Sequence, residues 1–191
     1  MSHLREKLVL ASGSPRRAEI LERAGWSHQI IVAGIDETVL PNEDPAAYVQ
    51  RLARSKAEAV ARRLKEGLVL GADTTVVVAK QILGQPVDEA DARRMLRLLN
   101  AKWHEVLTGV AVVRVGGEAR VGYQTTRVRF AEMSEQEIDW YIATGEPFGK
   151  AGAYGIQGKA SLFIEEIEGD YFNIMGLPIR LVYTLTRDYA D

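Results

Sequence analysis

Residues 8–20 read LVLASGSPRRAEI, and this stretch decides how the fold begins. The apolar run at 8–11 has the length and composition of a buried β-strand, and the small polar residues at 12–14 end it. Pro15 suits the first position of a helix, where its missing N–H does no harm, and Ser14 can cap that helix. The stretch therefore predicts a strand, a tight loop and a helix whose N-terminus faces the loop.

The rest of the chain continues with both helical and extended patterns. Turn residues and capping signals separate them, among them Asp44-Pro45 and the capping box of Ser134 and Glu137. The expected strands are 29–33, 68–78 and 162–164, with a hairpin of 106–115 and 118–130; the expected helices are 44–65, one from Asp88, one from Ser134, and 177–188. Helix-linked and hairpin-linked strands together predict an α/β fold with a mixed sheet and flanking helices in two or three layers.

Composition narrows the class of protein. The 191 residues suit one domain, 1–191, and no repeat or linker interrupts them. Lysine and arginine number 24 against 26 acidic residues, so no strong net charge favours nucleic acid or an anionic membrane. The chain contains no cysteine, which excludes disulfides and thiolate chemistry. The first residues lack a signal-peptide pattern and no apolar run is long enough to span a bilayer, so we expect a cytoplasmic protein.

The loop after the first strand has the composition of an anion-binding site. Ser12 and Gly13 lie before the expected helix, and Arg16 and Arg17 lie in its first turn. Backbone N–H groups at a helix N-terminus and planar guanidinium groups both bind phosphate. Arginine in a first turn also opposes the helix dipole, which is unusual for a purely structural helix. The alternative is an ordinary turn with solvated arginines.

Asp73 lies inside an otherwise apolar strand, where an unpaired carboxylate would cost several kcal/mol. Such a group could bind Mg²⁺ or Mn²⁺, or orient and deprotonate a water molecule. The alternative is a structural Asp that caps a turn or pairs with an arginine. The pair Asp36-Glu37 could supply another carboxylate to the same metal, although by itself it reads as a solvated loop pair. Lys56, in the long helix, reads by itself as a surface charge.

A glycine-rich loop at 150–158, KAGAYGIQG, carries one amide and one phenol ring. Gln157 has both a donor and an acceptor, which matches the imide edge of uracil or thymine. A flexible surface loop is the alternative. The histidines at 3, 28 and 104 share no metal-ligand spacing, so we predict structural or surface roles for them.

Five ordered blocks together resemble the Maf family of nucleotide pyrophosphatases, once described as septum formation inhibitors. These blocks are residues 8–20, the segment GADT at 71–74, residues 84–99 with His104 and Thr108-Gly109, the loop at 150–158, and GDYFNIMGLP at 169–178. The resemblance spans nearly the whole chain. It implies a fold like that of inosine triphosphate pyrophosphatases, with two lobes around a cleft, and a homodimer.

The resemblance also implies a reaction, cleavage of the bond between the α- and β-phosphates of a nucleoside triphosphate. By motif, Ser12, Arg16 and Arg17 would hold phosphate, and Glu37 and Lys56 would line the cleft. Asp73 would be the proton acceptor. Our own hypothesis adds a divalent metal cofactor, Mg²⁺ or Mn²⁺, held by Asp73 and Glu37.

Arg16, Thr74 and Gln157 resemble the subfamily that selects dTTP and UTP. The sister group that prefers 7-methyl-GTP has Gln rather than Thr after the Asp.

One departure from the family pattern bears on activity. Gln85 stands where the family usually has Lys, and a neutral side chain there forfeits a charge-assisted phosphate contact of about 1.5–3 kcal/mol unless Lys80 replaces it. Two other hypotheses stay open, the second of them because of this neutral residue. One is a pyrophosphatase of broad or purine specificity, and the other is a regulator of cell division that binds nucleotide without hydrolysing it.

Overall fold

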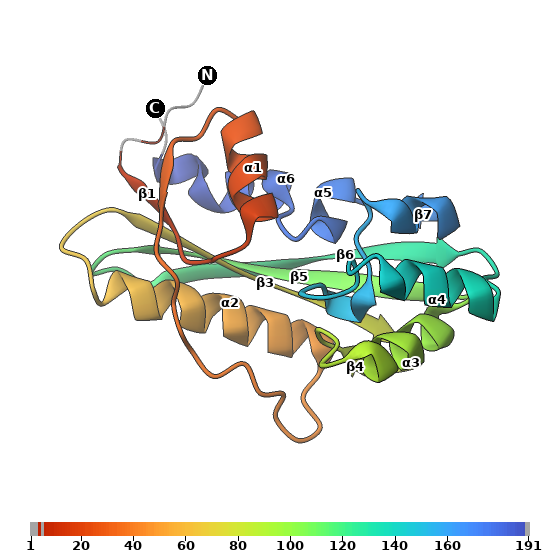
Figure 1. The fold of residues 1–191 in the computed structure, drawn as a ribbon. Helices are drawn as coiled ribbons and strands as arrows, with labels where there is room; N and C mark the ends of the chain where they lie inside the picture. The colour runs from red at the N-terminus through yellow and green to blue at the C-terminus, as the bar shows by residue number, and fades with distance from the viewer. Residues whose placement is uncertain (1–3, 5, 190–191) are drawn as a thin grey trace. The chain divides into compact units, whose positions relative to one another are not determined.

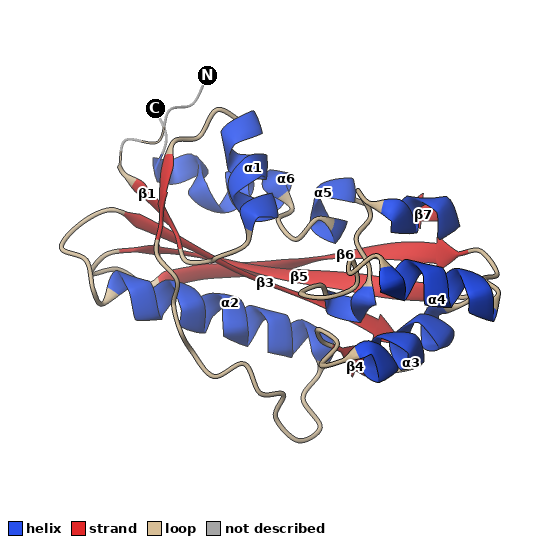
Figure 2. Cartoon of the chain, viewed as in Figure 1, coloured by secondary structure: helices blue, strands red, loops and turns tan. Residues whose placement is uncertain are grey.

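The structure is a computed structural model that describes residue 4 and residues 6–189. Its described strands form a seven-stranded sheet in the order β2-β1-β3-β5-β6-β7, with β4 paired to β3 (Figures 1 and 2). β1 runs parallel to β2 and β3, whereas the β3–β4 and β6–β7 pairs are antiparallel. The predicted mixed sheet is confirmed. The strands are β1 Leu8–Leu10, β2 His28–Ile30, β3 Leu68–Val78, β4 Gln81–Leu83, β5 Trp103–Arg114, β6 Ala119–Phe130 and β7 Ile164–Glu168.

Helices flank this sheet, and several begin at the predicted capping residues. Asp44 and Asp88 accept hydrogen bonds from the first turns of α2 and α3, and Ser134 with Glu137 forms the capping box of α4. The helices are α1 Pro15–Arg23, α2 Pro45–Ala61, α3 Glu89–Leu99, α4 Glu135–Ala143, α5 Tyr171–Ile174 and α6 Ile179–Thr186, with short 3₁₀ turns η1 Ala151–Ala153, η2 Lys159–Phe163 and η3 Arg187–Tyr189.

Some predicted boundaries are wrong. The strand expected at 29–33 spans only His28–Ile30, and the one expected at 162–164 begins at Ile164 because residues 159–163 form a 3₁₀ turn. The helix expected at 44–65 ends at Ala61, and the last helix continues from Thr186 as a 3₁₀ turn. Strand β4 and helix α5 were not predicted. Among the described residues, no helix combines the length and the apolar composition that crossing a bilayer requires.

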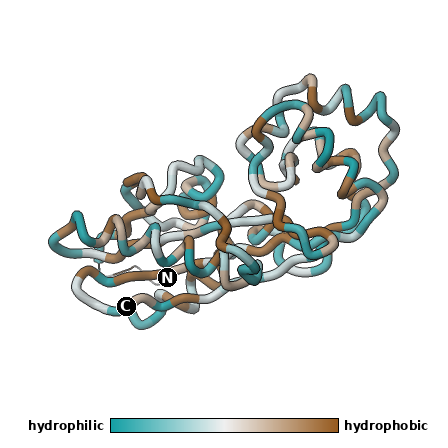
Figure 3. The backbone as a smooth tube through the Cα atoms, turned by 90° about the horizontal axis from the view of Figure 1, so that it is seen from below, coloured by the Kyte–Doolittle hydropathy of each residue, from teal (hydrophilic) through white to brown (hydrophobic). Residues whose placement is uncertain are grey.

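The chain divides into two compact units, and each contains hydrophobic and hydrophilic stretches (Figure 3). The first unit comprises residues up to Asp73, residues 108–124 and residues from Gly176 onward. The second comprises residues 74–107 and 125–175. Strands β3, β5 and β6 therefore contribute residues to both units.

In the first unit, helix α2 packs closely on the sheet (Figure 1). A Cβ added to Gly71 of β3 would lie 2.2 Å from the Ala53 carbonyl oxygen, and one added to Gly109 of β5 would lie 2.2 Å from that of Val49. Only glycine permits this approach, since both neighbours are backbone atoms. The buried side of α2 carries Val49, Ala53 and Val60, and it also carries Lys56. The close packing thereby directs a lysine inward.

The second unit has its own core. Its buried residues come from α3, α4, the glycine-rich segment and parts of β3, β5 and β6. Within this core the rings of His104, Phe130 and Tyr154 meet edge to face, with centroids 4.8–5.3 Å apart. Tyr154 thus anchors the glycine-rich segment, residues 150–158, in this core.

Candidate active site

The loop between β1 and α1 is organised by one buried arginine. Arg17 Nη1 donates to Ser12 Oγ at 2.9 Å, and Arg17 Nε donates to the Gly176 carbonyl at 2.8 Å. Ser12 Oγ also accepts from the Ser14 N–H at 3.2 Å. Ser14 holds the capping position of α1, but its side chain makes no capping bond, so that prediction is wrong and Ser12 binds its N–H instead. Pro15 begins the helix as predicted.

The two arginines are not simply solvated. Arg17 is 9% exposed and Arg16 is half-buried. Burial lowers the pKa of Arg17, while the negative charge of Asp73 opposes that shift. Arginine stays protonated in proteins, so the loop carries a fixed, partly desolvated positive charge at a helix N-terminus. That combination suits a phosphate group.

Asp73 occupies the predicted place within β3 and is 6% exposed. Its Oδ1 accepts a hydrogen bond from Lys56 Nζ at 2.6 Å. Lys56 Nζ also lies 2.9 Å from Glu37 Oε1. One ammonium group therefore joins the two carboxylates that the sequence nominated as metal ligands.

Lys56 is not the surface charge that its local sequence indicates, because it is 8% exposed. It lies seven residues, about two helical turns, beyond Val49 and thus on the same buried side of α2. Its burial is tolerated because both carboxylates compensate the ammonium charge. Glu37 itself is more open, with a side chain that is 53% exposed.

Burial raises the pKa of Asp73 above the usual aspartate value, although Lys56 and Arg17 act in the opposite direction. Glu37 contributes a smaller rise through like-charge repulsion. A carboxylate with a raised pKa is a better proton acceptor than an exposed one. The surroundings of Asp73 therefore favour general-base chemistry.

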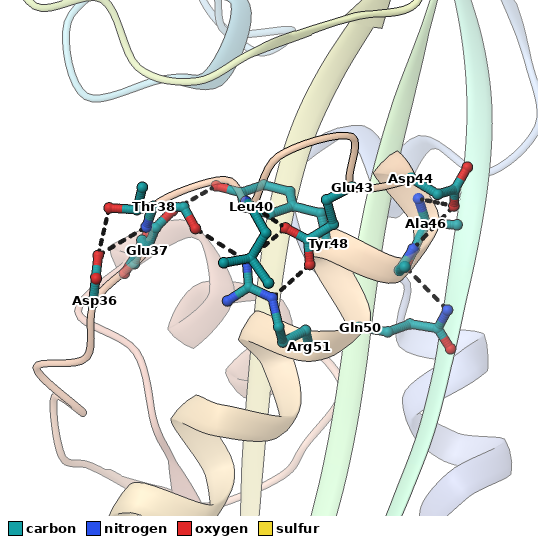
Figure 4. Close-up of polar contacts among 11 residues, drawn as sticks. Asp36, Glu37, Thr38, Leu40, Glu43, Asp44, Ala46, Tyr48, Gln50 and Arg51 are labelled. Carbon is teal, nitrogen blue, oxygen red and sulfur yellow. Dashed lines mark hydrogen bonds and ion pairs between the residues drawn. The ribbon is translucent and has the colours of Figure 1, made fainter.

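The segment that carries Glu37 is fastened to α2 (Figure 4). Tyr48 Oη donates to the Glu37 carbonyl at 3.1 Å, and Arg51 Nη2 donates to the Thr38 carbonyl at 3.1 Å. Arg51 also binds Glu43 through two nitrogens. Burial and the nearby acidic charges raise the pKa of Tyr48 to about 12, so its hydroxyl stays a donor at neutral pH. Sequence reasoning missed this clamp, whose only signal was three polar side chains around the start of a long helix.

Asp36, beside Glu37, has a structural role. Its Oδ1 accepts from Thr38 N at 2.9 Å and from Thr38 Oγ1 at 2.6 Å, and these bonds lower the pKa of Asp36. This pattern is a local turn that fixes the loop. Of the acidic pair, Glu37 alone bonds to Lys56.

The fit of a divalent metal can be judged from the donors. Among the described residues, no group of three or more His, Cys, Asp or Glu side chains is placed to hold a metal ion. Asp73 and Glu37 do supply two hard oxygen donors that share one cation, Lys56. Mg²⁺ is usually bound by one or two carboxylates together with substrate phosphates and water. These residues therefore fit a metal that arrives with a polyphosphate.

The remaining predicted residues, Thr74 and Gln157, belong to the second unit. Thr74 is half-buried and follows Asp73 directly in β3. Gln157 is exposed at the third position of a turn that the Gly158 N–H closes on the Gly155 carbonyl at 3.1 Å. Gln157 is thus presented to solvent by a hydrogen-bonded turn.

The two described histidines, His28 and His104, belong to no group of three or more potential metal ligands. His104 is buried, with Nε2 2.8 Å from Tyr154 Oη, and burial lowers its pKa to about 4, so it is neutral and structural as predicted. His28 bonds the Trp26 carbonyl through Nδ1. His3 lies outside the described residues.

Comparison with known proteins places this arrangement in a family. The model of the family described as "Maf-like protein" matches residues 7–189. A dTTP/UTP pyrophosphatase of Bacillus cereus is 51% identical over 186 residues, covering 97% of each chain. One from Hahella chejuensis is 53% identical over 189 residues, covering 97% of this chain and 94% of that protein. Among solved structures, the Ham1 protein of Staphylococcus aureus is 16% identical, with a TM-score of 0.47 over 66% of this chain and 73% of that one.

Proposed function

Since the chain belongs to the Maf family, we propose that it is a nucleoside triphosphate pyrophosphatase that hydrolyses dTTP and UTP to the monophosphate and pyrophosphate. The relatives that carry this activity in their names are about half identical over nearly the whole chain. The structural observation that carries the proposal is the buried bond of Asp73 to Lys56, beside Arg17 and Glu37.

The phosphates bind to the β1–α1 loop. Arg16 and Arg17 offset the charge of the triphosphate, and the Ser12 hydroxyl, which already accepts two hydrogen bonds, offers its own O–H to a phosphate oxygen. Arg17 is held by Ser12 and the Gly176 carbonyl, so little side-chain entropy is lost when the ligand binds. Lys56 adds a further positive charge on the side of Asp73.

Asp73 accepts the proton of the attacking water. The water oxygen forms a bond to the α-phosphorus, the bond from that phosphorus to the bridging oxygen breaks, and pyrophosphate leaves with the bonding electron pair. The arginines of the first loop stabilise the charge that develops on the leaving group. Asp73 can orient the water because Lys56 fixes its carboxylate.

Asp73 and Glu37 would hold a divalent cation, Mg²⁺ or Mn²⁺. When bound, such an ion neutralises phosphate charge and polarises the scissile bond. The Tyr48 and Arg51 bonds to the Glu37–Thr38 backbone keep the Glu37 carboxylate within reach of the same position as Lys56.

The base is selected by Thr74 and Gln157, together with Arg16. The Gln157 amide can donate to a carbonyl oxygen and accept from the N3–H of uracil or thymine. Cytosine has no N–H at that position, and its exocyclic amine replaces an acceptor, so the same amide would meet mismatched groups. We place the enzyme in the cytoplasm as a homodimer.

The test is a nucleotide panel with the purified protein and Mn²⁺ or Mg²⁺, in which monophosphate and pyrophosphate are quantified by chromatography. We expect dTTP and UTP to be turned over faster than CTP, ITP and 7-methyl-GTP. Asp73→Asn should lower kcat on UTP by about 10²–10⁴-fold, the usual contribution of a general base. Asp139→Asn, which removes an exposed partner of Arg93, is the matched control and should retain full activity.

Three results would contradict the proposal. Equal or faster hydrolysis of ITP or 7-methyl-GTP would favour a purine or broad pyrophosphatase. Binding of UTP without monophosphate would favour a nucleotide-binding regulator, which the neutral Gln85 keeps as an alternative. Near-normal turnover by Asp73→Asn would remove Asp73 from the reaction.

A further inference from the structure

The turn that presents Gln157 rests on a single carboxylate. Glu146 Oε2 accepts from the Lys159 N–H at 2.8 Å, and Glu146 Oε1 accepts from the Ala160 N–H at 3.4 Å. These two residues directly follow the turn formed by residues 155–158. A side chain outside the turn thus binds the backbone where the turn ends.

Tyr141 links the same carboxylate to the start of the turn. Tyr141 Oη donates to Glu146 Oε1 at 3.0 Å and accepts from the Gly155 N–H at 3.3 Å. The ring of Tyr141 is fully buried in the core of the second unit. The Gly155–Gly158 turn is therefore held at both ends, by Glu146 directly and by Glu146 through Tyr141.

Glycine at 158 makes room for this carboxylate. A Cβ added to Gly158 would lie 2.2–2.4 Å from the three atoms of the Glu146 carboxyl group. The Glu146 backbone is held too, because Lys150 Nζ donates to its carbonyl and its N–H donates to Thr144 Oγ1 at 3.2 Å. The turn and the carboxylate are packed against each other with no space for an intervening side chain.

The carboxylate is ionised at neutral pH. Burial tends to raise the pKa of Glu146, but the hydrogen bonds from Lys159, Tyr141 and Ala160 outweigh it, and the net pKa is lowered. An ionised carboxylate accepts at both oxygens, and both oxygens here receive donors. A glutamine at position 146 has the same size but only one acceptor oxygen. Its NH₂ group would face one of those N–H or O–H donors.

We propose that Glu146 is a positioning residue for base selection, because it fixes the turn that carries Gln157. This inference rests on the proposed function and adds to it a residue that need not touch the nucleotide. Pyrimidine selectivity by one amide requires its oxygen and nitrogen to be held in register with the base. Glu146 and Tyr141 supply that constraint through the backbone on either side of Gln157.

The test compares Glu146→Gln with Glu135→Gln, a control that loses an exposed ion pair with Arg97 in the same unit. Steady-state kinetics on UTP and CTP give kcat and KM for each. For Glu146→Gln we expect KM for UTP to rise about tenfold with kcat nearly unchanged, and the preference for UTP over CTP to fall by a similar factor. Competitive inhibition by tripolyphosphate, which has no base, should not change.

A double-mutant cycle separates positioning from general destabilisation. If Glu146 acts through Gln157, Glu146→Gln combined with Gln157→Ala should select UTP no less well than Gln157→Ala alone. Tyr141→Phe, which removes only the bridging hydroxyl, should shift selectivity in the same direction by less. It also serves as the second variant should Glu146→Gln fold poorly.

The outcomes distinguish this inference from the proposed function. No hydrolysis of UTP by the unaltered protein would overturn both. Normal hydrolysis with an unchanged ratio of UTP to CTP in Glu146→Gln and Tyr141→Phe would overturn the positioning role alone. A purely additive loss in the double variant would also overturn it, since Glu146 would then act independently of Gln157.

Discussion

Lys56 bonds to both candidate metal ligands, Asp73 and Glu37, and its charge affects how a metal cofactor can bind. Its ammonium group already compensates Asp73 and Glu37, at 2.6 Å and 2.9 Å. A divalent cation that entered alone would find two carboxylates whose charge is partly neutralised, with no third acidic or histidine ligand among the described residues. A bound nucleotide would bring the further oxygen ligands and additional negative charge.

We therefore predict that metal and nucleotide bind synergistically. The protein is titrated with Mn²⁺, and electron paramagnetic resonance measures the free ion. The affinity of the protein for Mn²⁺ should be at least about tenfold higher with a non-hydrolysable dTTP analogue than without it, a coupling of about 1.4 kcal/mol. Glu37→Gln should reduce that gain, whereas Glu58→Gln, which loses only the exposed contact with Arg54, should not. Tight Mn²⁺ binding without nucleotide would contradict the prediction.

At this scale the sequence reveals some site residues and conceals others. Asp73 is conspicuous because a carboxylate interrupts an apolar strand. Lys56 is not recognisable as a site residue, because the polar residues around it are typical of a solvated helix. Its burial depends on packing against strand β3, which begins 12 residues further along the chain. Glu146 is concealed as well, since its partners at 159 and 160 become neighbours only when the glycine turn folds back.

At the scale of elements, helix α2 and two glycines set the position of Lys56. The Ala53 carbonyl would lie 2.2 Å from a Cβ on Gly71, and backbone atoms cannot move aside as a flexible side chain can. A methyl group at 71 therefore pushes α2 away from β3, and it carries the ammonium group away from Asp73.

We predict that Gly71→Ala lowers the free energy of unfolding by about 1–3 kcal/mol or more, the usual cost of overpacking, and reduces kcat as well. Gly84→Ala is the control, because a Cβ there meets no atom within 4 Å and its φ is not in the left-handed region. Urea unfolding followed by circular dichroism gives both values. Equal stability of the two variants would show that α2 does not need this close approach.

Element prediction succeeded where local signals were strong. The long apolar β3 and the capped helices α2, α3 and α4 all begin within a residue or so of their predicted positions. It failed for β4 and α5, which have three and four residues and too little periodicity to detect. Residues 162 and 163 were assigned to a strand but end a 3₁₀ turn. Glu146 bonds the N–H groups of Lys159 and Ala160 where that turn begins, and no local pattern encodes such bonds.

At the scale of the molecule, the boundary between the two units falls inside a strand. Asp73 ends the first segment of one unit and Thr74 begins the first segment of the other, with β3 continuous through both. No change in composition or flexible linker marks this point, so the sequence indicates one domain of 191 residues. The division follows from which side chains pack together, and that depends on contacts remote in sequence.

The whole chain is expected to assemble as a homodimer. The described surface exposes several large apolar side chains, including Val87 at 85% and Leu162 at 72%, and a contact between two copies of the proposed homodimer would bury apolar surface of this kind. We expect sedimentation equilibrium at micromolar concentration to give twice the chain mass of 21.2 kDa. Because apolar contacts are insensitive to screening, the dimer should persist from about 0.1 M to about 1 M salt. A monomer, or a dimer that dissociates as salt rises, would contradict an apolar interface between two copies.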